Sequence, residues 1–189
     1  VGYMVGGFWL GNKAGMSGAV LHIINDAVMT LCVFMAAAAI SIRTDDDRLS
    51  SLGGIFKKMP LTMAAMVLGG LSLIGVPPTC GFFSKWYLIS GGIEAGHFGF
   101  VMALIVSSLV NVVLFFRCFE IGYFEPFVPG SQSHSAAVEP GSGAPTVQEA
   151  PVEMLFALMT TALLLLVLGL LSGQIVTRVI HQALPAVLG

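Results

Sequence analysis

The chain has 189 residues, of which 56% are hydrophobic and only 10% are charged. A soluble domain carries about 25% charged residues, so a chain with a mean hydropathy of +0.92 cannot cover a soluble surface with polar groups. Its formal net charge of -2 excludes the strongly basic footprint of a nucleic-acid-binding protein. We therefore expect an all-α integral membrane protein whose apolar runs cross the lipid bilayer.

The apolar runs predict about five transmembrane helices plus a partial first one. The partial one is residues 1–11, which are too short to cross a bilayer and are interpreted as the end of a span that begins earlier. One helix is expected to be interrupted at Pro77-Pro78. The helices expected after the partial one cover residues 15–42, 61–76, 82–93, 97–124 and 154–171.

The residues Pro77, Pro78 and Gly81 predict a break in a helix. Proline lacks an amide donor and disfavours the helical conformation in the residue before it. Backbone that is not helical is tolerated at membrane depth only inside protein or beside a water-filled cavity. Interrupted helices of this kind form the ion sites of many transporters.

Composition divides the chain into three parts. Residues 1–124 hold most of the apolar helices, and residues 125–152, rich in Pro, Gly and Ser, predict a flexible linker. Residues 153–189 supply the last transmembrane helix and an amphipathic tail. The linker has no Lys or Arg whereas residues 43–58 have four, so the positive-inside rule places the 43–58 loop in the cytoplasm.

Ionisable residues interrupt the apolar run at 15–42. His22, Asp26 and Thr30 are spaced four residues apart, so a helix places them on one face, with Asn25 beside them. A charged group in hydrocarbon costs about 3 kcal/mol or more unless it meets a partner or water. The cluster either fixes helix packing through hydrogen bonds or passes protons or sodium ions, and imidazole suits proton transfer because it changes charge near neutral pH. No third or fourth ligand accompanies the His22 and Asp26 pair, so no metal site is expected.

Lys85 lies in the apolar stretch GFFSKWYL, about two turns beyond the proline pair. It either extends to the membrane surface or lies at an ion site beside the helix break. Burial disfavours the charged form of lysine, so a buried Lys85 could take up and release a proton. Arg117 and Glu120 are three residues apart and are expected to form an ordinary ion pair near the membrane surface.

The stretches VGYMVGGFWLGNKAGMSGAVLHIINDAVMTLCVF and LGGLSLIGVPPTCGFFSKWYL resemble the antiporter-like membrane subunits. This family includes the proton-translocating subunits of respiratory complex I and their counterparts in Mrp-type sodium/proton antiporters. The resemblance covers residues 1 to about 124, and GVPPTCGFFSKW is its strongest motif. It implies that the chain is the C-terminal third of a core of about fourteen helices, from the end of the ninth to the fourteenth.

The resemblance also implies roles for individual residues. Lys85 falls at the position of the lysine, or glutamate in some members, that ends the family's proton path. His22 matches the first of three polar positions on the tenth helix, where the family usually carries His, His and Lys. Asp26 and Thr30 stand at the other two positions, so the family's bridging lysine is missing. The resemblance places the 43–58 loop on the outer side of the membrane, whereas the positive-inside rule places it in the cytoplasm.

We therefore expect a component of a proton- or sodium-translocating subunit that assembles with other integral membrane subunits in a bacterial or archaeal cytoplasmic membrane. Its parent complex would be an NADH-quinone oxidoreductase, a membrane hydrogenase or a cation/proton antiporter. No motif could hold a haem, flavin or iron–sulfur cluster, so no cofactor is expected in this chain. The alternative is a non-transporting structural subunit of such a complex, because the bridging lysine is missing.

Overall fold

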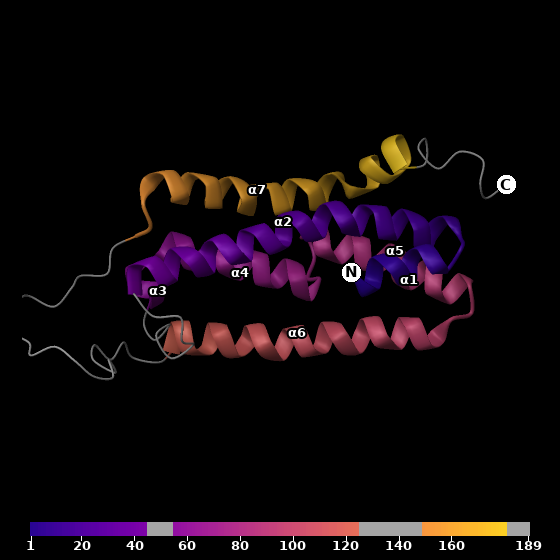
Figure 1. Ribbon diagram of the computed structural model, residues 1–189, viewed down its shortest axis with the longest axis horizontal. Helices are drawn as coiled ribbons and strands as arrows, with labels where there is room; N and C mark the ends of the chain where they lie inside the picture. The colour runs from indigo at the N-terminus through magenta and orange to yellow at the C-terminus, as the bar shows by residue number, and fades with distance from the viewer. Residues whose placement is uncertain (45–54, 125–148, 181–189) are drawn as a thin grey trace, which may run out of the picture.

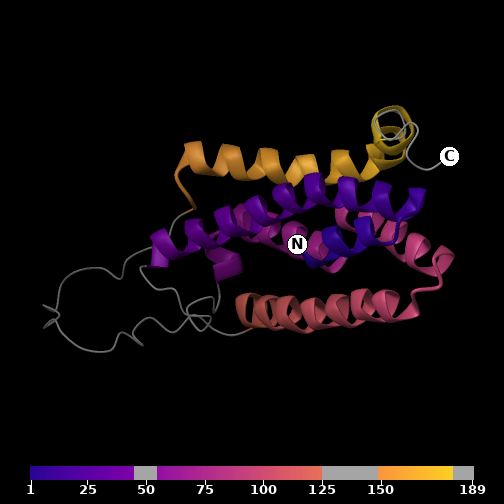
Figure 2. The same ribbon diagram turned by 45° about the vertical axis from the view of Figure 1, so that its right-hand side comes forward.

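The computed structural model describes residues 1–44, 55–124 and 149–180, and all regular structure in these ranges is helical. Figures 1 and 2 show long helices that run alongside one another in one bundle. The helices are α1 (Gly2–Trp9), α2 (Lys13–Thr44), α3 (Ile55–Lys58), α4 (Pro60–Ile74), α5 (Cys80–Glu94), α6 (Phe98–Phe124), α7 (Val152–Ile175) and the π-helix η2 (Val176–Ile180).

Three of these helices are long and apolar enough to cross a membrane: α2, α6, and α7 when it is extended to Arg178. The predicted all-α membrane protein is therefore confirmed. The half-length helices α4 and α5 have 15 residues each, whereas a crossing needs roughly 20 apolar residues. In Figure 1 they follow one another along α2, so the two runs predicted at 61–76 and 82–93 form one interrupted crossing.

The central helix is α2, which contacts α1, α4, α5 and α7. Its N-terminal half packs on α5, where a Cβ added to Gly18 would lie 2.8 Å from the backbone nitrogen of Leu88. Its C-terminal half packs on α4, where a Cβ added to Gly69 would lie 2.7 Å from the side chain of Val33. Glycine at such positions lets two membrane helices approach closely, so the interrupted crossing is held tightly along α2.

The break between α4 and α5 contains the predicted proline pair. Helix α4 ends at Gly75, whose φ of +94° is left-handed and favours glycine. The Pro77-Pro78 peptide bond is cis. Gly81 lies just beyond the break, in the first turn of α5, and a Cβ there would collide with the carbonyl oxygen of Ser72. The glycine thus lets the start of α5 touch the end of α4.

Helix α7 packs against one side of the break. A Cβ added to Gly169 would collide with the carbonyl oxygen of Pro78 and lie 2.9 Å from the backbone nitrogen of Cys80. The same helix contributes Leu158 and Leu165 to the main buried cluster that it forms with α2 and α4. Thr79 is buried, whereas Val76, Pro77 and Pro78 are exposed in this chain, so α7 covers the non-helical backbone on one side only.

Some of the sequence expectations concern parts of the chain that lie outside the described residues. Most of the expected linker falls in 125–148, and the end of the expected amphipathic tail falls in 181–189. Most of the 43–58 loop, to whose Lys and Arg residues the positive-inside rule was applied, lies in 45–54. The predictions of a flexible linker, an amphipathic tail and a membrane orientation therefore stay predictions.

Candidate ion-transfer site

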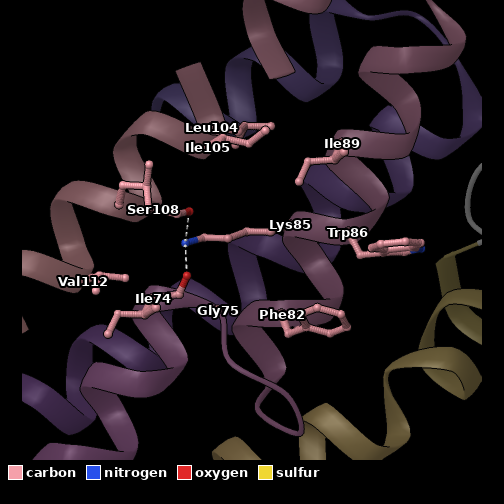
Figure 3. Close-up of a pocket in the computed structure, with 11 residues that line it drawn as sticks. Ile74, Gly75, Phe82, Lys85, Trp86, Ile89, Leu104, Ile105, Ser108 and Val112 are labelled. Atoms are coloured by element: carbon pink, nitrogen blue, oxygen red, sulfur yellow. Dashed lines mark hydrogen bonds between the residues drawn. The ribbon is translucent and has the colours of Figure 1, made fainter. Parts of the chain in front are cut away.

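Lys85 lies in the second turn of α5, and its side chain is only 6% exposed. Its Nζ donates hydrogen bonds to the carbonyl oxygens of Leu73 (2.7 Å) and Ile74 (3.0 Å) on α4. A third hydrogen bond, of 2.9 Å, goes to the hydroxyl oxygen of Ser108 on α6, as Figure 3 shows. An ammonium group has three donors, and each has an acceptor here. Lys85 therefore reaches back to the break and does not extend to the membrane surface.

The break explains why an ammonium group fits at this place. The last carbonyl groups of a helix have no partner within the helix, and Leu73 and Ile74 belong to the last turn of α4. The C-terminal end of a helix also carries partial negative charge and favours a cation. Because α4 ends inside the bundle, these acceptors are presented to a buried side chain and not to the membrane surface.

His22 lies on α2 close to the same break and is 3% exposed. Its Nδ1 is 2.9 Å from the hydroxyl oxygen of Ser84, the residue before Lys85. The Ser84 hydroxyl also donates to the carbonyl oxygen of Gly81 at 3.2 Å. A hydroxyl has one proton to donate, so while it serves Gly81 the Nδ1–H of His22 is the donor to Ser84.

The other polar residues on α2 differ in their surroundings. Asn25 is fully buried, and its Nδ2 donates to the carbonyl oxygen of Cys80 at 2.8 Å. Its Oδ1 has no hydrogen-bond partner within the described part of the chain. Asp26 and Thr30 are half-buried, and the charge of Asp26 acts on both His22 and Lys85. The structure therefore gathers His22, Asn25 and Lys85 at the break, with Asp26 within electrostatic range.

Tyr3 on α1 was not singled out by the sequence, but it is a neighbour of both His22 and Lys85. Its ring centroid is 5.3 Å from that of His22, and Lys85 Nζ lies 5.8 Å from the same Tyr3 centroid. The Tyr3 hydroxyl is buried and has no hydrogen-bond partner among the described residues. An unpaired buried hydroxyl is costly, so a polar group or a water molecule at this position would be stabilised.

A cavity of about 230 Å³ adjoins Lys85 between α5 and α6. Its walls are mostly apolar side chains such as Phe82, Ile89 and Leu104, and Lys85 and Ser108 contribute polar groups, as Figure 3 shows. One water molecule in the liquid takes about 30 Å³. The cavity is therefore large enough for several water molecules beside the ammonium group.

Arg117 and Glu120 lie apart from this site, near the end of α6. Arg117 Nη1 is 2.8 Å from Glu120 Oε2, and the two side chains are 56% and 58% exposed. An exposed ion pair of this spacing contributes only about 0.2–0.5 kcal/mol. Across residues 1–44, 55–124 and 149–180, no three His, Cys, Asp or Glu side chains gather into a group that could hold a metal ion.

Comparison with known proteins identifies the family. The family described as "NADH:quinone oxidoreductase/Mrp antiporter, TM" matches residues 1–111. The chain is 43% identical over 185 residues to NADH-quinone oxidoreductase subunit N of Desulforudis audaxviator, which covers 98% of this chain and 37% of that protein. The match to NAD(P)H-quinone oxidoreductase subunit 2 of Synechococcus elongatus is 29% identical over 174 residues and covers 92% of this chain and 33% of that protein.

A solved structure shares the fold. The chain is similar to a chain of the Mrp complex from Dietzia sp. DQ12-45-1b, with a TM-score of 0.80, 22% identity, and coverage of 100% of this chain and 42% of that one. The chain spans about a third of the length of the curated relatives it matches. The matched family region covers more than half of this chain. The chain therefore belongs to the NADH:quinone oxidoreductase/Mrp antiporter transmembrane family.

Proposed function

We propose that this chain forms the C-terminal part of an antiporter-like subunit that moves protons, or sodium ions, across a membrane. The observation that carries the proposal is the ammonium group of Lys85, buried at a helix break and held by the end of α4. Ionisable residues are expensive at membrane depth and mark ion pathways, and interrupted helices form the ion sites of transporters. The names of the relatives, a quinone oxidoreductase subunit and an Mrp complex, support the same function.

In this proposal Lys85 takes up and releases the transported proton. The protonated side chain uses three acceptors. A neutral amine keeps two N–H donors and gains a lone pair, so proton loss frees one acceptor and lets the amine accept a hydrogen bond. The cavity beside Lys85 and Ser108 gives water access to the group that changes charge. The hydrogen-bond pattern around Lys85 therefore changes with each proton that passes.

His22 and Ser84 supply the next polar step along the bundle. Their 2.9 Å contact joins α2 to α5 one residue before Lys85, and the Tyr3 ring lies against both His22 and Lys85. Imidazole can exchange a proton near neutral pH. The rest of the path comes from other membrane subunits, or from other parts of the subunit, in a multi-subunit complex. A bacterial or archaeal cytoplasmic membrane is the expected location, and the long apolar helices and the family match support a place in a membrane.

The test is Lys85→Met in the assembled complex, which replaces the ammonium with an apolar side chain of similar length. We expect the variant complex to contain the subunit in normal amount but to lose ion translocation per turnover of the complex. Translocation is measured as proton uptake by inverted membrane vesicles. Lys57→Met is the matched control, because Lys57 lies on α3 and is exposed. If Lys85→Met translocates as well as the control variant, Lys85 is not the transfer site.

A structural role is the second candidate function. The observation that favours it is that all three donors of Lys85 are already satisfied, two of them by the end of α4. A lysine that only caps α4 would stabilise the break without exchanging protons. In that case Lys85→Met lowers the melting temperature of the complex and leaves translocation per turnover intact. The same variant therefore separates the two functions.

A further inference from the structure

Helix α4 has opposite charges at its two ends, and both come from other parts of the chain. At its N-terminal end, Glu149 Oε1 accepts a hydrogen bond of 2.7 Å from the backbone N–H of Leu61. Glu149 Oε2 accepts a second hydrogen bond, of 2.8 Å, from the hydroxyl of Thr62. At its C-terminal end, Lys85 binds the last carbonyl groups. The fifteen residues of α4 itself include no charged side chain.

Both charges have the sign that the helix dipole favours. The first N–H groups of a helix lack partners within it, and Pro60 at the first position has no N–H to offer. The first N–H group that is free to donate is therefore that of Leu61, and the carboxylate of Glu149 accepts its hydrogen bond. Figure 1 shows the start of α7, which follows Glu149 in the chain, at the same end of the bundle as the start of α4.

The length of α4 sets the strength of the coupling between its two ends. Fifteen residues at about 1.5 Å each give a helix of roughly 22 Å. We take an effective dielectric constant of about 20 for two opposite unit charges at that separation. Their attraction then changes an equilibrium constant by a factor of about three. The helix dipole stabilises each of the two charges separately, because both ends are occupied by the favoured sign.

We propose that Glu149 is a positioning residue for Lys85: its negative charge, acting along α4, holds the ammonium group at the break. The proposal rests on the proposed transport function of Lys85. A hydrogen-bond cap alone does not require a charge, because neutral Ser, Thr and Asn side chains cap helices well. A charged group at the surface end of α4 is thereby linked to the ion-transfer site at its buried end.

The test separates the charge of Glu149 from its hydrogen bonds. Glu149→Gln keeps an oxygen acceptor for Leu61 and can donate from its amide nitrogen to the Thr62 oxygen, so only the charge is lost. We expect ion translocation to fall about three-fold, while hydrogen exchange at the start of α4 stays as slow as in the wild type. Thr62→Val removes a hydrogen bond and keeps the charge, and should translocate normally. Glu153→Gln is the matched control, an exposed carboxylate in the first turn of α7.

Two results would overturn the proposal: wild-type translocation in Glu149→Gln, or an equal loss in Thr62→Val. If Glu149→Gln lowers subunit content, Glu149→Asp must restore translocation, since it keeps the charge, and a failure to restore it also overturns the proposal. Lys85→Met distinguishes this failure from a failure of the proposed function. If Lys85→Met abolishes translocation and Glu149→Gln does not lower it, only the role of Glu149 is wrong.

Discussion

Ser108→Ala removes one of the three acceptors of the Lys85 ammonium and leaves the other two in place. A hydrogen bond to a charged group contributes about 1.5–3 kcal/mol. Ser108 and Lys85 both line the cavity of about 230 Å³, so a water molecule can replace part of the lost bond. We therefore expect a loss of about 1 kcal/mol, which is about five-fold in the equilibrium that holds the ammonium at the break.

The assay is proton uptake by inverted membrane vesicles, normalised to turnover and to subunit content. Translocation by Ser108→Ala should fall several-fold, and Ser108→Thr, which keeps the hydroxyl, should retain most of it. Ser107→Ala is the matched control, because Ser107 is half-buried on the same helix and lines no part of the cavity. Equal translocation by Ser108→Ala and Ser107→Ala would refute the reasoning.

Three further substitutions test the break and its neighbours. Gly81→Ala forces a Cβ onto the carbonyl oxygen of Ser72 on α4. It should destabilise the subunit by about 2–3 kcal/mol, which would be measured as a smaller amount of assembled subunit. The control Gly173→Ala, whose Cβ meets nothing within 4 Å, should assemble normally. Ser84→Ala deprives His22 of its 2.9 Å partner and should lower translocation at constant subunit content; unchanged translocation would remove this pair from the path. Asn12→Ala breaks two hydrogen bonds of the α1–α2 turn, one to the carbonyl oxygen of Gly91 on α5 (2.7 Å) and one from the backbone N–H of Gly15 (2.8 Å). It should cost about 1–2 kcal/mol, and an unchanged melting temperature would contradict this.

The helix break could be predicted from the sequence because its cause is local. Pro77 and Pro78 remove two amide donors in succession, and no helix continues through that arrangement. The sequence also predicts one helix interrupted at Pro77-Pro78, but it does not show that the second half continues in the same direction, because a chain can also turn back after prolines. The direction depends on how α4 and α5 pack along α2, for example at Gly18 and Gly69, and such contacts leave no local pattern.

The site could be predicted only in part, for a related reason. His22 and Lys85 stand out because ionisable groups are rare in apolar runs. The acceptors of Lys85 on α4 are backbone carbonyls, which every residue carries, so no residue type marks them. Ser108 lies beside Ser107 and close to Asn111 in a mostly apolar run, and these polar residues were an available signal. Glu149 caps a helix 88 residues away in sequence, which no local pattern reveals.

The central claim is that the polar groups at the break carry ions and do more than hold helices together. The most direct measurement is a structure of the assembled complex at a resolution that shows ordered water. We predict water molecules in the cavity beside Ser108 and Lys85, and others that pair with the Tyr3 hydroxyl and lead to His22. A cavity filled by lipid or apolar side chains, with no water near Lys85, Tyr3 or His22, would contradict the claim.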